Sequence, residues 1–161
     1  MDLSFLKWPI IIVVVLGGAW LLSDGGVNYM EKRFTADQPG KDAQVDKADE
    51  AGLSRLGAFL MFTFRYKHAD QIFQKCAQRY PNGANYWLNL FRRARLQEKL
   101  AGGTSDPQKS KMFYQASLDI LVHLIKVNAH EKDDRVPNND ILRLRADKLA
   151  EVHELGEVGQ F

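Results

Sequence analysis

The sequence predicts an all-α protein in which a single N-terminal transmembrane helix precedes a domain of helical hairpins with a C-terminal capping helix. Three observations support this fold class. Nearly all of the continuous apolar sequence lies before Ser23. The rest of the chain is polar and repeats its apolar residues at helical spacing. Small and apolar residues there also recur at a spacing typical of paired helices. The expected segments are a membrane anchor at 1–23, a juxtamembrane segment and linker at 24–49, and the helical domain at 50–161.

Composition limits the classes of function. The chain has 161 residues, of which 45% are hydrophobic and 26% charged, and its formal net charge is +2. A net charge this small does not indicate a nucleic-acid partner. Cys76 is the only cysteine, so no intrachain disulfide can form. Packing therefore has to stabilise the fold.

The apolar segment from Trp8 to Leu22 contains no charge. At about 1.5 Å per residue it is shorter than the roughly 30 Å hydrocarbon core, but counting from Leu3 gives about 20 residues, which span it. Lys7 then extends toward the headgroups. Trp8 and Trp20 lie near the two ends, as interfacial aromatic residues do. Since lipid cannot pair with the backbone, a helix is favoured over a strand.

Two alternatives to an uncleaved anchor are a cleaved signal peptide and a buried strand. A signal peptide would have a weakly basic start, and no Ala-x-Ala site follows the apolar run. A buried strand is usually about 4 to 8 residues long. Gly17 and Gly18 give the anchor a flat patch for packing against another helix. The predicted location is a membrane crossed once. For a bacterial source this is the inner membrane with the soluble domain in the periplasm, although the positive-inside count does not decide the side.

The segment after the anchor is either a helix or a tether. Val27, Met30 and Phe34 recur at helical spacing with charges between them. This suits a short helix on the membrane surface or a partly ordered tether. The polar composition from Thr35 to Glu50 predicts a solvated spacer and the domain boundary.

The helical domain opens with a predicted hairpin that resembles the tetratricopeptide repeat family. The family pattern is Trp-x-x-Leu-Gly-x-x-Tyr, then Ala-x-x-x-Phe, then Pro. The matching residues here are Leu53, Leu56, Gly57, Leu60, Ala69, Phe73 and Pro81. Gly57 and Ala69 let the paired helices approach closely, and Phe73 fills the gap beside them. Leu53 and Leu60 depart from the family's Trp and Tyr. The resemblance spans roughly 50–128 and implies binding to other proteins.

A second repeat begins with Trp87 and Leu90, about 34 residues after the first. Phe91 replaces the glycine of the pattern, and the segment 101–107 interrupts it. Ala116 and Ile120 stand for the family's Ala-x-x-x-Phe pair. The second repeat is therefore a stretched copy of the first.

The C-terminal part predicts further helix starts. Asp106 followed by Pro107 is typical of a helix N-terminus. The segment 130–134 is predicted as a charged, solvated loop, and Asn138 or Asn139 as the cap of a final helix. Its apolar positions are Ile141, Leu142, Leu144, Leu149, Val152 and Leu155. Two repeats are fewer than the about three usually needed, so we expect this helix and a partner to supply the missing cover.

The resemblance also implies a partner site. In tetratricopeptide proteins the first helix of each hairpin lines a concave groove. On this chain the groove residues are Ser54, Ala58, Met61, Asn85, Leu88, Arg92 and Arg95. Arginine in the groove would bind a partner's carboxylates bidentately, and the alternative is a solvated helix face. Ser54 and Ala58 stand where some relatives carry a Lys/Asn clamp, so binding of chaperone tails is not expected.

The sequence contains no recognisable catalytic motif. The histidines lack the spacing of a metalloprotease helix, and they are His68, His123, His130 and His153. Cys76 has no Cys-x-x-Cys partner and is interpreted as a core residue. No glycine-rich phosphate loop is present. We therefore predict no enzyme, no cofactor and no metal.

Together these features predict a non-catalytic, membrane-anchored scaffold for protein–protein interaction, an accessory subunit of a larger membrane complex. Its partners would be other subunits and the lipid bilayer, which the anchor contacts through Trp8, Gly17, Gly18 and Trp20. The alternative is a transient assembly factor or adaptor that binds a client peptide in the groove. A small enzyme is the third hypothesis.

Overall fold

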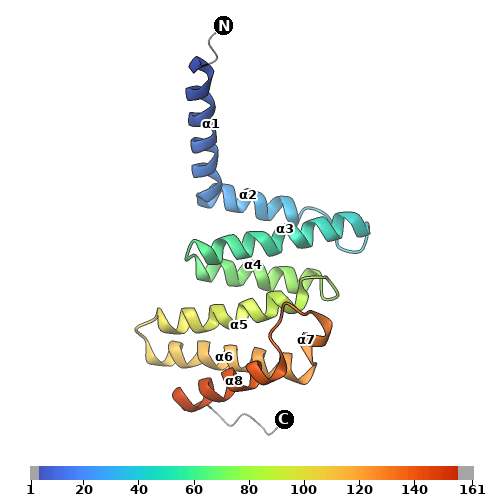
Figure 1. Cartoon of the computed structure of the whole chain (residues 1–161), viewed down its shortest axis with the longest axis vertical. Helices are drawn as coiled ribbons and strands as arrows, with labels where there is room; N and C mark the ends of the chain where they lie inside the picture. Colours follow the sequence, from blue (N-terminus) through green and yellow to red (C-terminus); the bar gives the residue numbers. More distant parts are fainter. Residues whose placement is uncertain (1–3, 156–161) are drawn as a thin grey trace. The chain divides into compact units, whose positions relative to one another are not determined.

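The computed structural model describes residues 4–155, which form eight helices and no strand (Figure 1). This confirms the all-α fold class. The chain divides into two compact units, Met1–Gln38 and Pro39–Phe161, and each is described by itself.

The first unit contains α1 (Ser4–Leu22) and α2 (Asp24–Phe34), which Ser23 separates. The Ser23 hydroxyl accepts a hydrogen bond from the Gly26 backbone N–H, 3.3 Å away, and so caps α2. The juxtamembrane segment is thus helical rather than a tether.

Among the described helices, none is by itself long and apolar enough to cross a bilayer. The segments Trp8–Trp20 and Asp24–Phe34 meet the length and composition only as a pair, and they are bent by 74° relative to each other. The single transmembrane helix therefore stays a prediction.

The second unit starts earlier than the sequence indicated. Helix α3 (Ala43–Phe62) begins inside the segment predicted as a solvated spacer. The Asp42 carboxylate accepts hydrogen bonds from the backbone N–H groups of Gln44 and Val45, and so caps the helix. Glu50 is buried at 4% exposure. The linker is therefore shorter than predicted, because the cap and the buried acidic residue were not recognised.

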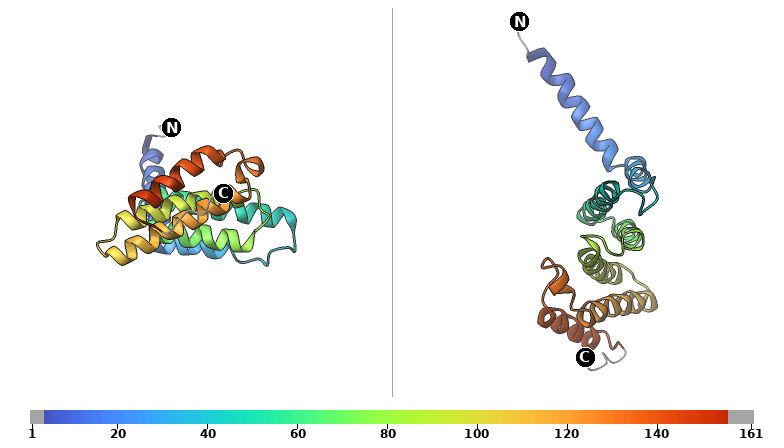
Figure 2. Two further views of the ribbon diagram at one scale, coloured as in Figure 1. Left: turned by 90° about the horizontal axis from the view of Figure 1, so that it is seen from below. Right: turned by 90° about the vertical axis from the view of Figure 1, so that its right-hand side faces the viewer.

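The remaining helices form a stack of two layers. Their bounds are α4 (Tyr66–Arg79), α5 (Tyr86–Gly102), α6 (Pro107–Lys126), the short α7 (Ala129–Lys132) and α8 (Asn139–Val152). Two successive hairpins, α3–α4 and α5–α6, follow each other along the chain, and α8 packs on α6. In the right-hand view of Figure 2, which looks along the helix axes, α3, α5 and α8 lie in one layer and α4 and α6 in the other. Asp106 and Asn138 cap α6 and α8, as expected from the sequence.

The first hairpin is closed by the contact between Gly57 and Phe73. A Cβ on Gly57 would lie 2.7 Å from Cε1 of the Phe73 ring. Leu53, Leu60, Ala69 and Phe73 are fully buried. The expected close approach is confirmed, because only a residue without a side chain leaves room for the ring.

In the second hairpin the expected packing pair was wrong by one residue. Ala116 and Ile120 are only partly buried, whereas Ser117 and Leu121 are fully buried. Ser117 is tolerated inside because its hydroxyl donates a 3.1 Å hydrogen bond to Glu98. The sequence pattern favoured alanine as the small residue and so missed the serine.

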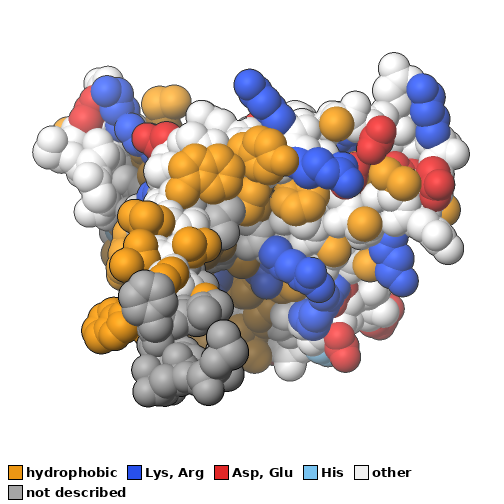
Figure 3. Space-filling view, turned by 90° about the horizontal axis from the view of Figure 1, so that it is seen from above, with side chains coloured by type: hydrophobic (Ala, Val, Ile, Leu, Met, Phe, Trp, Pro, Cys, Tyr) orange, Lys and Arg blue, Asp and Glu red, His pale blue; other side chains and the backbone are white. Residues whose placement is uncertain are grey.

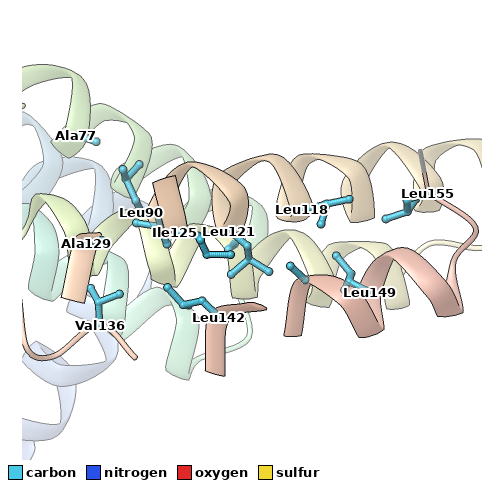
Figure 4. Close-up of a cluster of buried hydrophobic side chains, with 13 residues drawn as sticks. Ala77, Leu90, Leu118, Leu121, Ile125, Ala129, Val136, Leu142, Leu149 and Leu155 are labelled. Carbon is cyan, nitrogen blue, oxygen red and sulfur yellow. The ribbon is translucent and has the colours of Figure 1, made fainter. Parts of the chain in front are cut away.

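Apolar side chains from α4 to α8 form one continuous core (Figure 4). Leu121, Val136 and Leu142 are fully buried within it. The segment predicted as a charged loop is partly ordered, because α7 occupies its first part and Asp133 is buried. The predicted tail at 156–161 lies outside the described residues. Because Leu142, Ala146 and Leu149 of α8 belong to this core, the capping helix packs against the second hairpin, as predicted.

The Gly57–Phe73 contact predicts the effect of adding one methyl group. Gly57→Ala should lower the free energy of unfolding by about 1–3 kcal/mol, because the methyl group overlaps the ring. Urea unfolding of the full chain in mild detergent measures this. Gly102→Ala is the matched control, since nothing lies within 4 Å of its added Cβ. Equal stability of the two variants would show that the contact is not tight.

Candidate functional site

A buried carboxylate joins α3 to the start of α5. Glu50 Oε1 accepts a hydrogen bond from the Asn85 backbone N–H at 2.6 Å, and Oε2 accepts one from the Ala84 N–H at 3.1 Å. These donors lie at the N-terminus of α5, where backbone N–H groups lack helical partners and favour negative charge. A Cβ on Gly83 would overlap the carboxylate. Glu50 therefore fixes α5 against α3.

A chain of polar contacts continues this joint toward α4. The Ser54 hydroxyl donates to Asn89 Oδ1 at 2.8 Å, and Asn89 Nδ2 donates to Cys76 Sγ at 3.4 Å. Arg92 Nη1 donates to the Ser54 hydroxyl at 3.2 Å, and its guanidinium lies 5.7 Å from the Phe73 ring centre. Burial lowers the pKa of Arg92 from its usual value, and the nearby charge of Arg135 adds to this effect. The network couples three helices.

The cysteine in this network is a buried thiol. Burial, together with the negative charge of Glu50, raises the pKa of Cys76 to about 12. At neutral pH it is therefore protonated and not a thiolate nucleophile. Within residues 4–155, no three His, Cys, Asp or Glu side chains gather in an arrangement suited to a metal ion.

A second ionic contact holds the loop after α7 over the same end of α5. Arg135 binds both carboxylate oxygens of Asp133, at 2.7 and 2.9 Å, and also donates to Asn85 Oδ1 at 3.0 Å. Burial raises the pKa of Asp133, but the hydrogen bonds and charge of Arg135 outweigh this and hold it below its usual value. The Asn85 side chain is thus used inside the fold.

The residues predicted to line a groove do not form one open surface. Ser54 is 4% exposed, and Arg92 is bonded to it. The half-buried positions are Ala58, Met61, Asn85, Leu88 and Arg92. Arg95 is exposed. The structure brings Ser54 and Arg92 together as internal contacts and leaves Arg95 as the accessible cation of the set.

Arg95 borders a cleft between α5 and α8. The cleft has a volume of about 330 Å³. Its lining residues are Arg95, Glu98, Lys99, Tyr114, Arg145, Leu149 and His153. Arg145 is paired bidentately with Glu98, at 2.9 and 2.7 Å, and the rings of Tyr114 and His153 stack at 3.5 Å. The pairing and the stacking fix the shape of the cleft.

Three cations beside this cleft make no ion pair with any residue that the structure describes. Arg95 and Lys99 lie on α5. Lys148 lies on α8, where it lines a second pocket that shares Glu98, Arg145, Leu149 and His153 with the cleft. All three side chains are exposed. Unpaired cations around an apolar and aromatic cleft favour a ligand that carries carboxylates.

Helix α8 adds an apolar stripe to this region. Ile141, Leu144 and Val152 are 55%, 71% and 61% exposed, and their spacing places them on the same side of the helix as Lys148. Leu142 and Leu149 on the adjacent side enter the core. We call the three cations and these three apolar residues the α5–α8 surface. It combines exposed apolar area with unpaired positive charge.

Comparison with protein-family models, characterised proteins and solved structures gives no match for this chain. Any statement on its function therefore rests on its own residues.

The sequence contained the signal for the stripe on α8, but this signal was missed. The apolar residues of this helix were treated as one set, although they form two rows on adjacent sides of the helix. Leu142, Ala146 and Leu149 form the first row and are buried. The second row consists of Ile141, Leu144 and Val152 and forms the exposed stripe. Separating the two rows would have identified it.

The Glu50 joint predicts the effect of removing one acceptor. Glu50→Gln should lower the free energy of unfolding by about 1–3 kcal/mol, because an amide N–H₂ cannot accept the second backbone N–H. Hydrogen exchange of the Ala84 and Asn85 amides should also accelerate. Urea unfolding and exchange monitored by NMR measure both effects. Glu151→Gln, on the exposed side of α8, should change neither, and an unchanged Glu50→Gln variant would contradict the assigned joint.

Proposed function

We propose that this chain is a non-catalytic, membrane-anchored scaffold that binds another protein subunit through the α5–α8 surface. The observation that carries the proposal is the stripe of Ile141, Leu144 and Val152, which shares a helix side with Lys148 and reaches, at Val152, the pocket next to the cleft that Arg95 and Lys99 border. Exposed apolar residues next to a polar rim are typical of a protein-binding surface. The partner that fits is an amphipathic helix with acidic residues along one edge.

The likeness to a tetratricopeptide array supports this type of partner. Hydrogen bonds from α3 to the start and middle of α5 join residues that are 35 apart, at Glu50–Asn85 and Ser54–Asn89. A constant offset of about 34 residues is the period of that family. The last helix that the structure describes is α8, and its apolar stripe is left exposed. We infer that the partner supplies a helix that packs on this stripe.

The membrane anchor is supported by the exposure of α1. The large apolar side chains of α1 that the structure describes are about half exposed or more. These residues are Trp8, Ile10, Ile11, Ile12, Val13, Val15, Leu16 and Trp20. In Figure 3, a view from above, hydrophobic side chains gather on the face turned to the viewer, with charged side chains around them. Such a helix needs lipid or protein cover on every side.

The bend at Ser23 suits the edge of a bilayer. The Trp20 and Tyr29 rings lie 5.7 Å apart across it, and aromatic residues concentrate at membrane interfaces. Lys32 and Arg33 are exposed in the last turn of α2. We propose that α1 enters the membrane and that α2 lies along the headgroups.

The three unpaired cations also favour the second candidate, a transient adaptor for an acidic client. A constitutive subunit should co-purify in fixed stoichiometry and withstand moderate salt. An adaptor held mainly by Arg95, Lys99 and Lys148 should bind substoichiometrically and dissociate as salt screens the charges. The salt dependence of the association separates the two.

Photocrosslinking tests the proposed surface. A photoreactive amino acid at Leu144, in the full chain in its own membrane, should give one dominant protein adduct. The double variant Arg95→Glu, Lys148→Glu should lower the yield of this adduct about tenfold, because reversing two charges replaces attraction by repulsion. A tenfold loss corresponds to about 1.4 kcal/mol of binding free energy.

Two controls make this test specific. The photoreactive residue at Gln74, exposed on α4, should not give the same adduct. Lys41→Glu with Lys47→Glu changes the net charge equally at exposed positions outside the surface and should leave the yield unchanged. An adduct at Leu144 that survives the Arg95 and Lys148 changes would show that these cations do not hold the partner, and no adduct at Leu144 would place the partner elsewhere.

A further inference from the structure

The turn between α3 and α4 exposes two phenylalanines. Phe62, the last residue of α3, is 80% exposed, and Phe64 is 77% exposed. The Phe64 ring contacts Tyr66 edge to face, with 6.0 Å between the ring centres. Isolated exposed apolar residues are common, but two nearly bare phenylalanines at one turn are not explained by the core.

Phe64 is also unfavourable for its own backbone. Its φ is +61°, in the left-handed region where glycine is preferred. The Arg65 N–H bonds to the Leu60 carbonyl at 2.9 Å and the Phe64 N–H to the Met61 carbonyl at 3.3 Å. This is the helix-ending motif that usually places glycine at the position of Phe64. The phenylalanine therefore costs stability and gains little packing, which points to a role for its exposed ring.

Lysines surround the aromatic residues at this end of the stack. A shallow depression of about 500 Å³ lies between the α3–α4 turn and the loop from α5 to α6. Its lining includes Phe64, Tyr66, Phe113, Lys67, Lys99 and Lys109, and no acidic residue. Lys109 lies 3.6 Å from Asp106 in an exposed pair, while Lys67 makes no ion pair with a described residue. We call these six residues together with Phe62 the aromatic end, which shares Lys99 with the α5–α8 surface.

We propose that the aromatic end docks on the anionic surface of a bilayer, with the phenylalanines at the acyl boundary and the lysines at the headgroups. The proposal rests on the membrane anchor proposed above. Amphipathic surfaces with aromatic residues on one side and lysines around them bind anionic membranes in this way.

The chemistry of this end favours lipid over a protein partner. The cations that line its depression are all lysines, which are depleted in protein interfaces, whereas arginine is enriched there. Lysine binds phosphate headgroups as a mobile point charge and extends along apolar surface. The two most exposed aromatic residues, Phe62 and Phe64, lie at the last position of α3 and in the turn after it, not along one helix face.

An environment-sensitive fluorophore tests the docking in the full chain. Phe62→Cys is labelled with a nitrobenzoxadiazole dye, and the native Cys76 should stay unlabelled because it is 1% exposed. The protein is reconstituted into vesicles of phosphatidylcholine alone or with phosphatidylglycerol added. The emission should shift to the blue and become protected from iodide only when the anionic lipid is present, and high salt should reverse this change.

Two further variants separate docking from folding. Phe64→Gly removes the strained backbone position, so it should maintain or raise stability while weakening docking several-fold. Lys67→Glu with Lys109→Glu should weaken docking at least about fivefold, read as the phosphatidylglycerol fraction at half-maximal shift. The dye at Asp134→Cys, an exposed loop position after α7 at the opposite end of the second unit (Figure 1), should stay water-exposed throughout.

The outcomes distinguish this inference from the anchor. If the chain fails to float with vesicles, the anchor itself is refuted, and the docking falls with it. If the chain floats but the dye at residue 62 stays water-exposed on every vesicle, the anchor stands and the docking is overturned. An equal shift on phosphatidylcholine alone, unaffected by the lysine changes, would also overturn it.

Discussion

The buried carboxylate of Glu50 is the contact on which the helical unit depends. It holds the first two backbone donors before α5, at 2.6 and 3.1 Å, and Gly83 leaves the space it needs. Burying a carboxylate is unfavourable unless hydrogen bonds compensate it, and a helix N-terminus supplies both donors and positive potential. Because α5 is fixed in this way, its residues Asn89 and Arg92 both bond to Ser54 of α3, and the second hairpin takes its place in the stack.

This joint explains why the predicted groove residues act as structure. Ser54 and Arg92 bond to each other, and Asn85 bonds to Arg135, so their polar atoms are engaged within the fold. The exposed residues that remain available to bind a partner therefore lie at the edges of the stack. One edge is the α5–α8 surface, with Lys148 and Leu144 toward a proposed protein partner. The other is the aromatic end, which we assign to lipid.

Sequence patterns predicted the parts of the fold that depend on local chemistry. The caps Asp106 and Asn138 and the contact of Gly57 with Phe73 could be predicted, since each follows from residue type and short spacing. The role of Glu50 could not, because its partners lie 34 and 35 residues away and their free N–H groups arise only once α5 forms. For the same reason Ser54 was expected to face a groove.

The central claim is that this chain serves as a stable subunit of a membrane complex. Native mass spectrometry of the full-length protein, extracted from its own membrane in mild detergent, tests it most directly. The account predicts a complex of fixed stoichiometry that persists at moderate salt and is lost when Arg95 and Lys148 are changed together to glutamate. A lone chain, or a mixture of weak and salt-sensitive partners, would contradict the claim and favour the adaptor.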